Sequence, residues 1–151
     1  MPEPNNMNTG KGKNFQSIAA EVLGYHFQVK FQTEYPIPIG NPPKNHKFDL
    51  VSENGKYIGE CKNYSWTEGG NVPSAKMGFI NEAVFYLQHI SSDKFRFVAL
   101  RRDIDNNRIE TLADYYYRMN KHLLNGVFVI EIDILTKSVR ILGDQGRFFK
   151  H

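Results

Sequence analysis

Asp49, Glu60 and Lys62 are residue types that a metal-dependent reaction uses, and they stand close together in the chain. Asp49 precedes Glu60 by 11 residues, and Lys62 follows Glu60 by two. Carboxylate oxygens suit Mg²⁺ or Mn²⁺, and such an ion acidifies a bound water and offsets negative charge on a phosphate. A nearby lysine could orient that water or stabilise the developing charge. Chance alone supplies about one acid-x-Lys triplet in a chain of this composition, so the context of the triplet decides its meaning.

A hairpin turn is expected to bring these side chains to one face of a sheet. Asn54-Gly55 is the strongest short hairpin signal, and it separates two short strands at 48–52 and 57–62. A two-residue type I′ turn makes Asp49 face Glu60, and Lys62 shares the face of Glu60. A divalent cation between the two carboxylates would offset their repulsion, with the lysine as a second positive charge. The alternative is an exposed hairpin whose Glu–Lys pair is worth under ~1 kcal/mol.

The elements around this hairpin alternate between helices and strands. Asn14 can cap a helix that Gly24 ends, and Ser74 can cap a second helix. Residues 1–13 lack apolar periodicity and are predicted to form a flexible arm, which leaves 14–151 as a single domain. The expected helices are 14–24, 74–90 and 111–125, and the expected strands are 25–37, 48–52, 57–62, 94–100, 127–135 and 139–142. The order predicts an α/β fold with a mixed central sheet flanked by helices.

These residues and this order resemble the PD-(D/E)XK nuclease superfamily. Asp49 lies on the second strand, and Glu60-Cys61-Lys62 ends the third. The order α-β-β-β-α-β from about residue 14 to 101 resembles the restriction-endonuclease-like core, to which this chain adds a C-terminal helix and β-hairpin. The resemblance implies that Asp49, Glu60 and the backbone carbonyl of Cys61 bind the catalytic metal, and that Lys62 is the catalytic lysine.

Two further positions bear on the resemblance. Several members of the superfamily add a glutamate from the first helix, and Glu21 is the matching candidate for the catalytic site. Phe48 stands where the name of the motif has proline, a departure that many members share.

The resemblance implies a Mg²⁺-dependent deoxyribonuclease that hydrolyses phosphodiester bonds, with Mn²⁺ as a substitute. The small size fits a site-specific double-strand endonuclease of the restriction or homing type, or a Holliday-junction resolvase. Because one domain holds one such site, cutting both strands of duplex DNA would need a homodimer or homotetramer. A non-catalytic nucleic-acid-binding module on the same fold, and an unrelated α/β scaffold with an accidental triplet, are the competing hypotheses.

Polar and basic residues near the expected site are candidates for nucleic-acid contacts. One group immediately precedes Asp49, a second lies in the loop after Lys62, and others begin a helix or end a strand. Basic side chains there would bind phosphates and set register. The candidates are Lys44, Asn45, His46, Lys47, Trp66, Asn71, Lys76, Arg101 and Arg102.

Composition and the remaining motifs narrow the alternatives. A net charge of +3 permits a nucleic-acid partner without requiring one. The single cysteine excludes an internal disulfide, the five histidines lack zinc-ligand spacing, and no apolar run reaches membrane length, so we expect a cytoplasmic protein. Glu131 and Asp133 share a strand face without a lysine two residues later, and we interpret them as the solvated side of an edge or outer strand. Tyr116 belongs to a helical stripe and is expected in the core.

Overall fold

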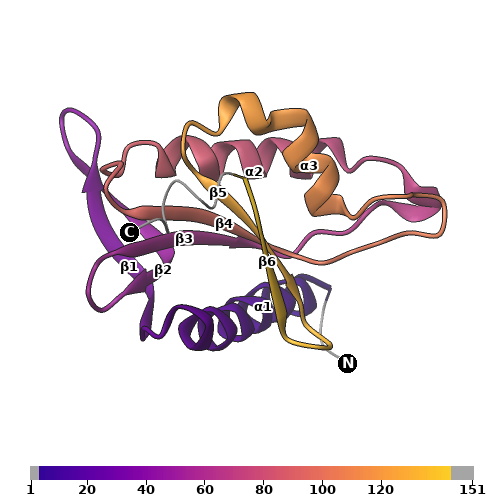
Figure 1. The fold of residues 1–151 in the computed structure, drawn as a ribbon, viewed down its shortest axis with the longest axis horizontal. Coiled ribbons are helices and arrows are strands. Elements are labelled where there is room, and N and C mark those ends of the chain that lie inside the picture. The colour runs from indigo at the N-terminus through magenta and orange to yellow at the C-terminus, as the bar shows by residue number, and fades with distance from the viewer. Residues whose placement is uncertain (1–3, 144–151) are drawn as a thin grey trace.

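The computed structural model describes residues 4–143, which form one six-stranded sheet with helices on both faces (Figure 1). The helices are α1 (Pro4–Phe27), α2 (Ser74–Leu87) and α3 (Leu112–Asn120), with short 3₁₀ turns at Glu68–Gly70 and Lys121–Leu123. The strands are β1 (Phe31–Ile39), β2 (Lys44–Ser52), β3 (Tyr57–Lys62), β4 (Phe95–Arg101), β5 (Phe128–Asp133) and β6 (Ser138–Leu142). The order α-β-β-β-α-β and the additional helix and hairpin are as expected from the sequence.

The sheet is mixed, and its strands lie in sequence order from β1 to β6. Neighbours joined by hairpins are antiparallel, namely β1 with β2, β2 with β3, and β5 with β6. The central strands β3, β4 and β5 run parallel, and α2 and α3 form the two crossovers between them. Figure 1 shows both crossover helices on one side of the sheet and α1 on the other. This α/β arrangement is compatible with a restriction-endonuclease-like core.

Each face of the sheet has its own hydrophobic core, and β4 contributes to both. Phe95, Phe97 and Ala99 pack under α1, whereas Val98 and Leu100 pack under α2 and α3. A parallel strand covered on both faces needs a continuous apolar run rather than an alternating pattern, as this strand has. The prediction that Tyr116 is in the core is confirmed, since its side chain is fully buried on α3.

The first helix is longer at both ends than the capping residues suggested. It begins at Pro4, so the structure does not show the expected flexible arm over residues 4–13, while residues 1–3 lie outside the described part. Once a helix is nucleated, each added residue gains a hydrogen bond, and propagation extends past a favourable cap.

Gly24 does not end this helix, because the C-terminal motif is formed three residues later. Gln28 adopts a left-handed φ of 56° and donates to the carbonyl of Tyr25, while Val29 donates to the carbonyl of Gly24. This pair of hydrogen bonds is the Schellman motif, in which the left-handed residue is usually glycine. Gly24 is needed for space instead, since a Cβ there would lie 2.9 Å from the carbonyl oxygen of Val29.

The turn between β2 and β3 differs from the predicted two-residue type I′ turn. The strands stop at Ser52 and start again at Tyr57, and the amide of Gly55 donates to the carbonyl of Ser52. Only Gly55 has a positive φ in this turn, 73°, whereas a type I′ turn requires two such residues. The Ser52 hydroxyl also accepts from the Tyr57 amide and donates to Asn54, so side chains close a four-residue loop.

Glu131 is not on a solvated face, which corrects our interpretation of the Glu131 and Asp133 pair. The β6 strand covers the outer side of β5, and the Glu131 side chain is only 3% exposed. One of its carboxylate oxygens accepts hydrogen bonds from Arg140 at 2.9 and 3.1 Å and from Arg102 at 3.3 Å. Glu131 is therefore a buried acid at the centre of an ion-pair cluster with two partly exposed arginines.

No helix among residues 4–143 is both long enough and apolar enough to span a membrane.

Candidate active site

The register of the β2–β3 hairpin brings Asp49 and Glu60 together. Leu50 pairs with Gly59 and Val51 with Ile58, which is the register expected from the sequence although the turn is different. At the next position Asp49 would pair with Glu60. There, hydrogen bonds between side chains and backbone amides take the place of the backbone–backbone hydrogen bonds of the sheet. The Asp49 amide donates to Glu60 Oε2 at 3.2 Å, and the Cys61 amide donates to Asp49 Oδ2 at 2.8 Å. Each carboxyl group is thus held by the backbone of the opposite strand.

The backbone of β2 changes direction at Asp49, which explains why the ladder ends here. Phe48 packs with the core under α2, whereas Leu50, two residues on, packs with the core under α1. Side chains two residues apart in a regular strand share one face. On the neighbouring strand β1, Glu34 lies between Thr33, which pairs with Leu50, and Tyr35, which pairs with Phe48. Glu34 has a φ of 52°. The irregularity directs the Asp49 carboxylate between the strands rather than onto a sheet face.

Glu60 is a buried acid beside a second acid, and its ionisation reflects this. The residue is 6% exposed. Burial, followed by the charge of Asp49, raises the pKa of Glu60 well above its ordinary range. Without a cation, the Asp49–Glu60 pair therefore holds a proton at neutral pH. A divalent ion would offset the same charge that the proton offsets.

Lys62 supplies positive charge to the pair. It is the last residue of β3 and is partly exposed, and its charge opposes the rise in the pKa of Glu60. The thiol of Cys61 between them packs with the core under α1. Burial and the two neighbouring acids raise the pKa of the Cys61 thiol, so the side chain stays neutral. The backbone of Cys61, rather than its sulfur, faces the carboxylates.

His46 belongs to the site, although we expected it to contact nucleic acid. Its Nε2 lies 2.8 Å from Glu60 Oε1, and its ring stacks on Tyr86 of α2 at 4.3 Å with an interplanar angle of 11°. Burial lowers the pKa of His46, with the charge of Asp49 acting in the opposite direction. The hairpin register alone could not place it, since His46 lies three residues before Asp49 and a regular strand would direct it to the opposite face of the sheet. The change of direction at Asp49 brings it to Glu60.

Helix α2 adds residues to the surroundings of the site that the sequence analysis missed. The charge of Glu82 acts on both His46 and Tyr64, and Asp49 also acts on Tyr64. Phe79, Glu82 and Tyr86 recur at helical spacing on a face that differs from the buried stripe of α2. This second stripe was the available signal.

Glu21 is not brought to the carboxylate pair. Its side chain is 73% exposed and forms an ion pair with Lys137 at 3.4 Å, in the turn between β5 and β6. Glu21 lies on α1, and the opposite face of this helix packs against the sheet through the hydrophobic core between them.

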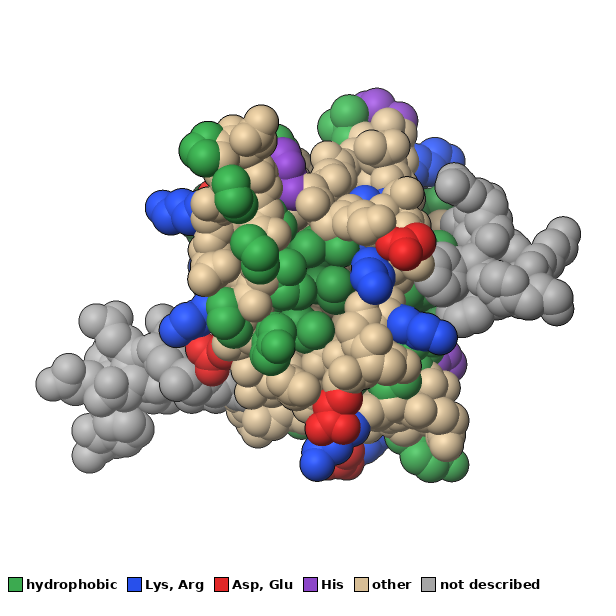
Figure 2. All heavy atoms as spheres, turned by 90° about the vertical axis from the view of Figure 1, so that its left-hand side faces the viewer, with side chains coloured by type: hydrophobic (Ala, Val, Ile, Leu, Met, Phe, Trp, Pro, Cys, Tyr) green, Lys and Arg blue, Asp and Glu red, His purple; other side chains and the backbone are tan. Residues whose placement is uncertain are grey.

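The basic residues that precede Asp49 remain available to a nucleic acid. Lys44, Asn45 and Lys47 are exposed on the β1–β2 hairpin. Lys44 and Asn45 line a groove of about 330 Å³ with Phe85 and Tyr86 of α2. Figure 2 shows this side of the molecule, where hydrophobic side chains gather in a hollow with lysine and arginine side chains around it.

Among the candidates beyond the site, Trp66 is unavailable. It is 6% exposed, with the Arg108 guanidinium 4.2 Å above its ring, and its amide donates to Asp103. The carbonyl of Asn71 closes a turn with Thr67, although the residue itself is exposed.

The three remaining basic candidates differ in how firmly they are held. Lys76 is exposed, and its ammonium lies 5.1 Å from the Tyr64 ring centroid beside the site. Arg101 donates to Asn63 at 2.6 Å, and Arg102 joins the Glu131 cluster. Lys76 is thus the most accessible of the three.

The donor set fits a magnesium-type ion better than a metal held wholly by protein. Among the described residues, no three His, Cys, Asp or Glu side chains are grouped so that they could hold a metal ion. Mg²⁺ is commonly bound through one or two carboxylates, several waters and phosphate oxygens of the substrate. Asp49 and Glu60 meet that requirement, with the Cys61 carbonyl as the further oxygen that the resemblance implies.

Comparisons with known proteins support the fold. No protein-family model and no curated protein matches the chain. Among solved structures, it is similar to an XisH family protein from Nostoc punctiforme PCC 73102, with a TM-score of 0.51 and 15% identity over 85% of this chain and 98% of the other. It is also similar to an fdxN element excision controlling factor protein from Anabaena variabilis, with a TM-score of 0.50, 15% identity and the same coverage. At this identity the likeness concerns the arrangement of helices and strands.

Proposed function

We propose that this protein is a Mg²⁺-dependent deoxyribonuclease that hydrolyses phosphodiester bonds at the Asp49–Glu60 pair. The supporting observation is the reciprocal bonding of the two carboxyl groups to opposite strands, next to Lys62. The accidental-triplet hypothesis gives no reason for two acids to be held together at a cost in Coulomb energy. A metal site does, because the cation removes that cost when it binds.

The chain's own residues have separable roles in this proposal. Asp49 and Glu60 hold the metal, which when bound supplies a water of lowered pKa and charge for the phosphate. Lys62 orients the attacking water or stabilises the charge that develops on the phosphate. His46 fixes the position of the Glu60 carboxyl through its 2.8 Å contact and is itself held by Tyr86. His46 is therefore a positioning residue.

The substrate we propose is double-stranded DNA. The exposed Lys44 and Lys47 lie on the strand that leads to Asp49, and Lys76 lies at the start of α2 beside Tyr64. These side chains would bind phosphates on either side of the scissile bond. A homodimer or homotetramer would place two sites on one duplex, as a site-specific restriction or homing endonuclease requires. A Holliday-junction resolvase would need the same two sites.

Cleavage of supercoiled plasmid with Mg²⁺ tests the proposal. The full chain should nick or linearise the plasmid, and Asp49→Ala and Lys62→Ala should not. Lys137→Ala is the matched control, since Lys137 is an exposed lysine that pairs with Glu21. Cleavage that survives the first two substitutions would reject the site. An intact plasmid that is nevertheless retarded in a gel would identify a non-catalytic binding module. Faster cutting of a four-way junction than of a linear duplex would favour the resolvase alternative.

A further inference from the structure

The groove beside the carboxylate pair has walls for which the proposed reaction gives no role. It has a volume of about 330 Å³ and lies between the β1–β2 hairpin and the C-terminal end of α2 with the residues just after it (Figure 2). Ile39, Lys44 and His46 line it from the hairpin, and Phe85, Tyr86 and His89 line it from the helix side. Because His46 also lies 2.8 Å from Glu60, a ligand in the groove would be next to the reacting phosphate.

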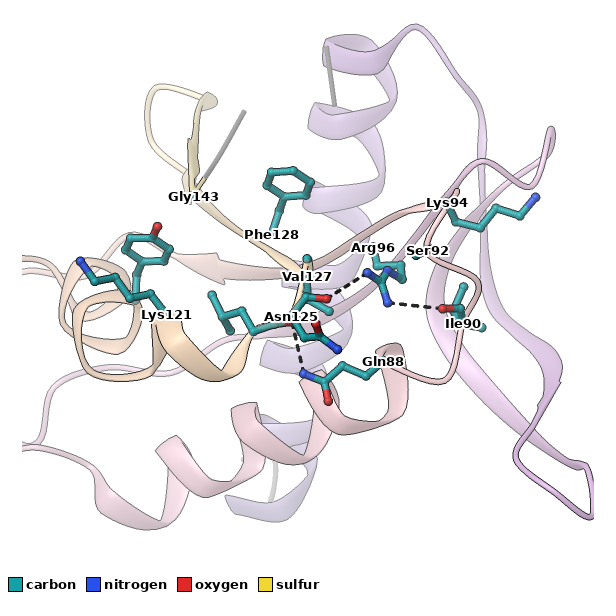
Figure 3. A pocket seen from close by; sticks show the side chains of 13 residues that line it. Gln88, Ile90, Ser92, Lys94, Arg96, Lys121, Asn125, Val127, Phe128 and Gly143 are labelled. Carbon is teal, nitrogen blue, oxygen red and sulfur yellow. Dashed lines mark hydrogen bonds between the residues drawn. The ribbon is translucent and has the colours of Figure 1, made fainter. Parts of the chain in front are cut away.

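Both walls of the groove are held in place by contacts outside it. Gln88 donates to the carbonyl of Leu124 at 3.2 Å, which fixes the end of α2 to the segment before β5 (Figure 3). On the hairpin, Ile37 and Ile39 pack against the core under α2. The groove is therefore formed before a ligand arrives, and binding there need not pay to order a loop.

The helix wall presents aromatic rings, and one of them is open to solvent. Phe85 is 59% exposed, and its ring centroid lies 5.0 Å from that of His89 and 6.1 Å from that of Tyr86. Tyr86 in turn stacks on His46 at 4.3 Å. A chain of ring contacts thus runs from the Glu60 carboxyl group to the exposed ring of Phe85. This wall suits a flat ligand that can stack.

The charge of the groove lining is positive. Lys44 is exposed and lies two residues before His46 in a regular part of the β1–β2 pairing, so the two side chains share a face of the hairpin. The contact of His46 with Tyr86 shows that this face is directed toward α2. None of the lining residues is acidic, and Glu82, whose charge acts on His46, does not line the groove. The lining therefore complements a ligand that is both flat and anionic.

The larger cavity, of about 610 Å³ at the amino ends of β4 and β5, lacks this combination. Lys94 and Lys121 extend away from Arg96 there (Figure 3), and Arg96 is 5% exposed and donates to the carbonyls of Ile90 and Asn125. This cavity shares no lining residue with the groove. The groove is thus the better place for a ligand that also reaches the carboxylate pair.

We propose that the groove binds an unpaired base of the DNA substrate, stacked on Phe85 beside the phosphodiester at the Asp49–Glu60 pair. This inference rests on the proposed function. A base inside a double helix has both faces covered by its neighbours, so only a base outside the stack can meet the ring. Stacking on aromatic side chains is how proteins bind unpaired bases, and Lys44 would bind a phosphate of the same strand. Extruding a base costs least where it is already unpaired, so the duplex would carry an unpaired nucleotide at the cleavage point.

Fluorescence anisotropy of labelled DNA with the full chain in EDTA tests the groove, and cleavage does not enter the measurement. The probes are two duplexes of the same sequence, one fully paired and one with a single unpaired adenine. We expect wild type to bind the second probe about fivefold or more tightly than the first, and Phe85→Ala to lose most of this preference. Phe85→Tyr retains a ring and should retain the preference. Tyr25→Ala is the matched control, since it removes an exposed ring from α1 on the other side of the sheet (Figure 1).

The outcomes separate the groove from the nuclease. Equal binding of the two probes by wild type, or an undiminished preference in Phe85→Ala, would overturn the proposal. If the same protein still cut plasmid with Mg²⁺, the nuclease would stand without a base site. A preference that depends on Phe85 in a protein that cuts no DNA would support the base site on a non-catalytic nucleic-acid-binding module. Equal weakening of both probes by Phe85→Ala would show that the ring contacts paired DNA, and would also overturn the proposal.

Discussion

The Glu60 carboxylate accepts the amide hydrogen of Asp49, and the Asp49 carboxylate accepts the amide hydrogen of Cys61, the residue after Glu60. This reciprocal arrangement connects an irregular strand to a regular one at the only point where two acids face each other across the hairpin. Each carboxyl group uses one oxygen on the backbone of the opposite strand. The other oxygen of Glu60 lies 2.8 Å from Nε2 of His46.

The stability of the metal-free protein should fall as the pH rises, and Glu60 should be the cause. Glu60 ionises near 4.5 in the unfolded chain, but its raised pKa keeps it protonated in the folded protein to a higher pH. Between these two pH values the folded state binds more protons, so the free energy of unfolding decreases with pH. In Glu60→Gln that decrease should shrink by ~1 kcal/mol or more, because each pKa unit corresponds to ~1.4 kcal/mol.

Urea denaturation at pH 5 and pH 8 without divalent metal measures this effect. An equal loss of stability between the two pH values in wild type and Glu60→Gln would contradict the assigned ionisation. Glu53→Gln is a suitable control, since Glu53 is an exposed acid in the same hairpin.

Binding of Mg²⁺ should release a proton. At pH 7.5 the carboxylate pair holds one proton, and a cation that binds the ionised pair must displace it. Calorimetric titration of Mg²⁺ in two buffers of different ionisation enthalpy should therefore give different apparent enthalpies for wild type. Asp49→Asn should abolish the difference together with the binding. Identical enthalpies in both buffers, with binding intact, would show that the pair is already ionised.

His46→Ala should destabilise the protein more than removal of an exposed histidine does. The substitution removes a partly buried contact with Glu60 and a ring stacked on Tyr86, and we expect a loss of about 1–3 kcal/mol. His89→Ala removes an exposed ring that meets the edge of Phe85 and should cost less than about 0.5 kcal/mol. Equal effects of the two substitutions on the denaturation midpoint would remove the argument that His46 positions Glu60.

Arg140→Met should reduce stability without affecting chemistry. Glu131 is buried and accepts two hydrogen bonds from Arg140, which also pairs with Asp114 at 2.9 Å. Removing Arg140 leaves the buried acid with Arg102 alone, and we expect a cost of about 2 kcal/mol. Arg102→Ala should cost less, since its single contact is longer at 3.3 Å. Cleavage per folded molecule should stay at the wild-type value, and a loss there would mean that Glu131 takes part in the reaction.

The sequence predicted the elements and the hairpin register because both follow from local patterns. Apolar periodicity located the sheet and helices, and the alternation of residues around Asn54-Gly55 set the pairing of Val51 with Ile58. The register was right although the turn was not, because the two-residue and four-residue loops connect the strands in the same alignment. The α/β class followed from the alternating order of the elements.

Residues whose roles depend on contacts across the fold could not be predicted in this way. Trp66 is buried under Arg108 and Tyr115, which lie far from it in the sequence. Glu131 was expected in solvent because a strand pattern shows which residues share a face, but not that β6 will cover it with Arg140. The position of Glu21 likewise depends on which side of α1 meets the sheet. Each of these errors came from one element being considered without its neighbour.

The central claim is that the Asp49–Glu60 pair and Lys62 cleave DNA. The most direct measurement is the single-turnover rate of duplex cleavage with saturating Mg²⁺, with wild type, Asp49→Asn and Lys62→Ala compared at equal folded concentration. We predict that each substitution lowers the rate by about 100-fold or more, the scale expected when a charge-stabilising or proton-transferring group is lost. A rate within about twofold of wild type for either variant, which is under ~0.5 kcal/mol of barrier, would contradict the account.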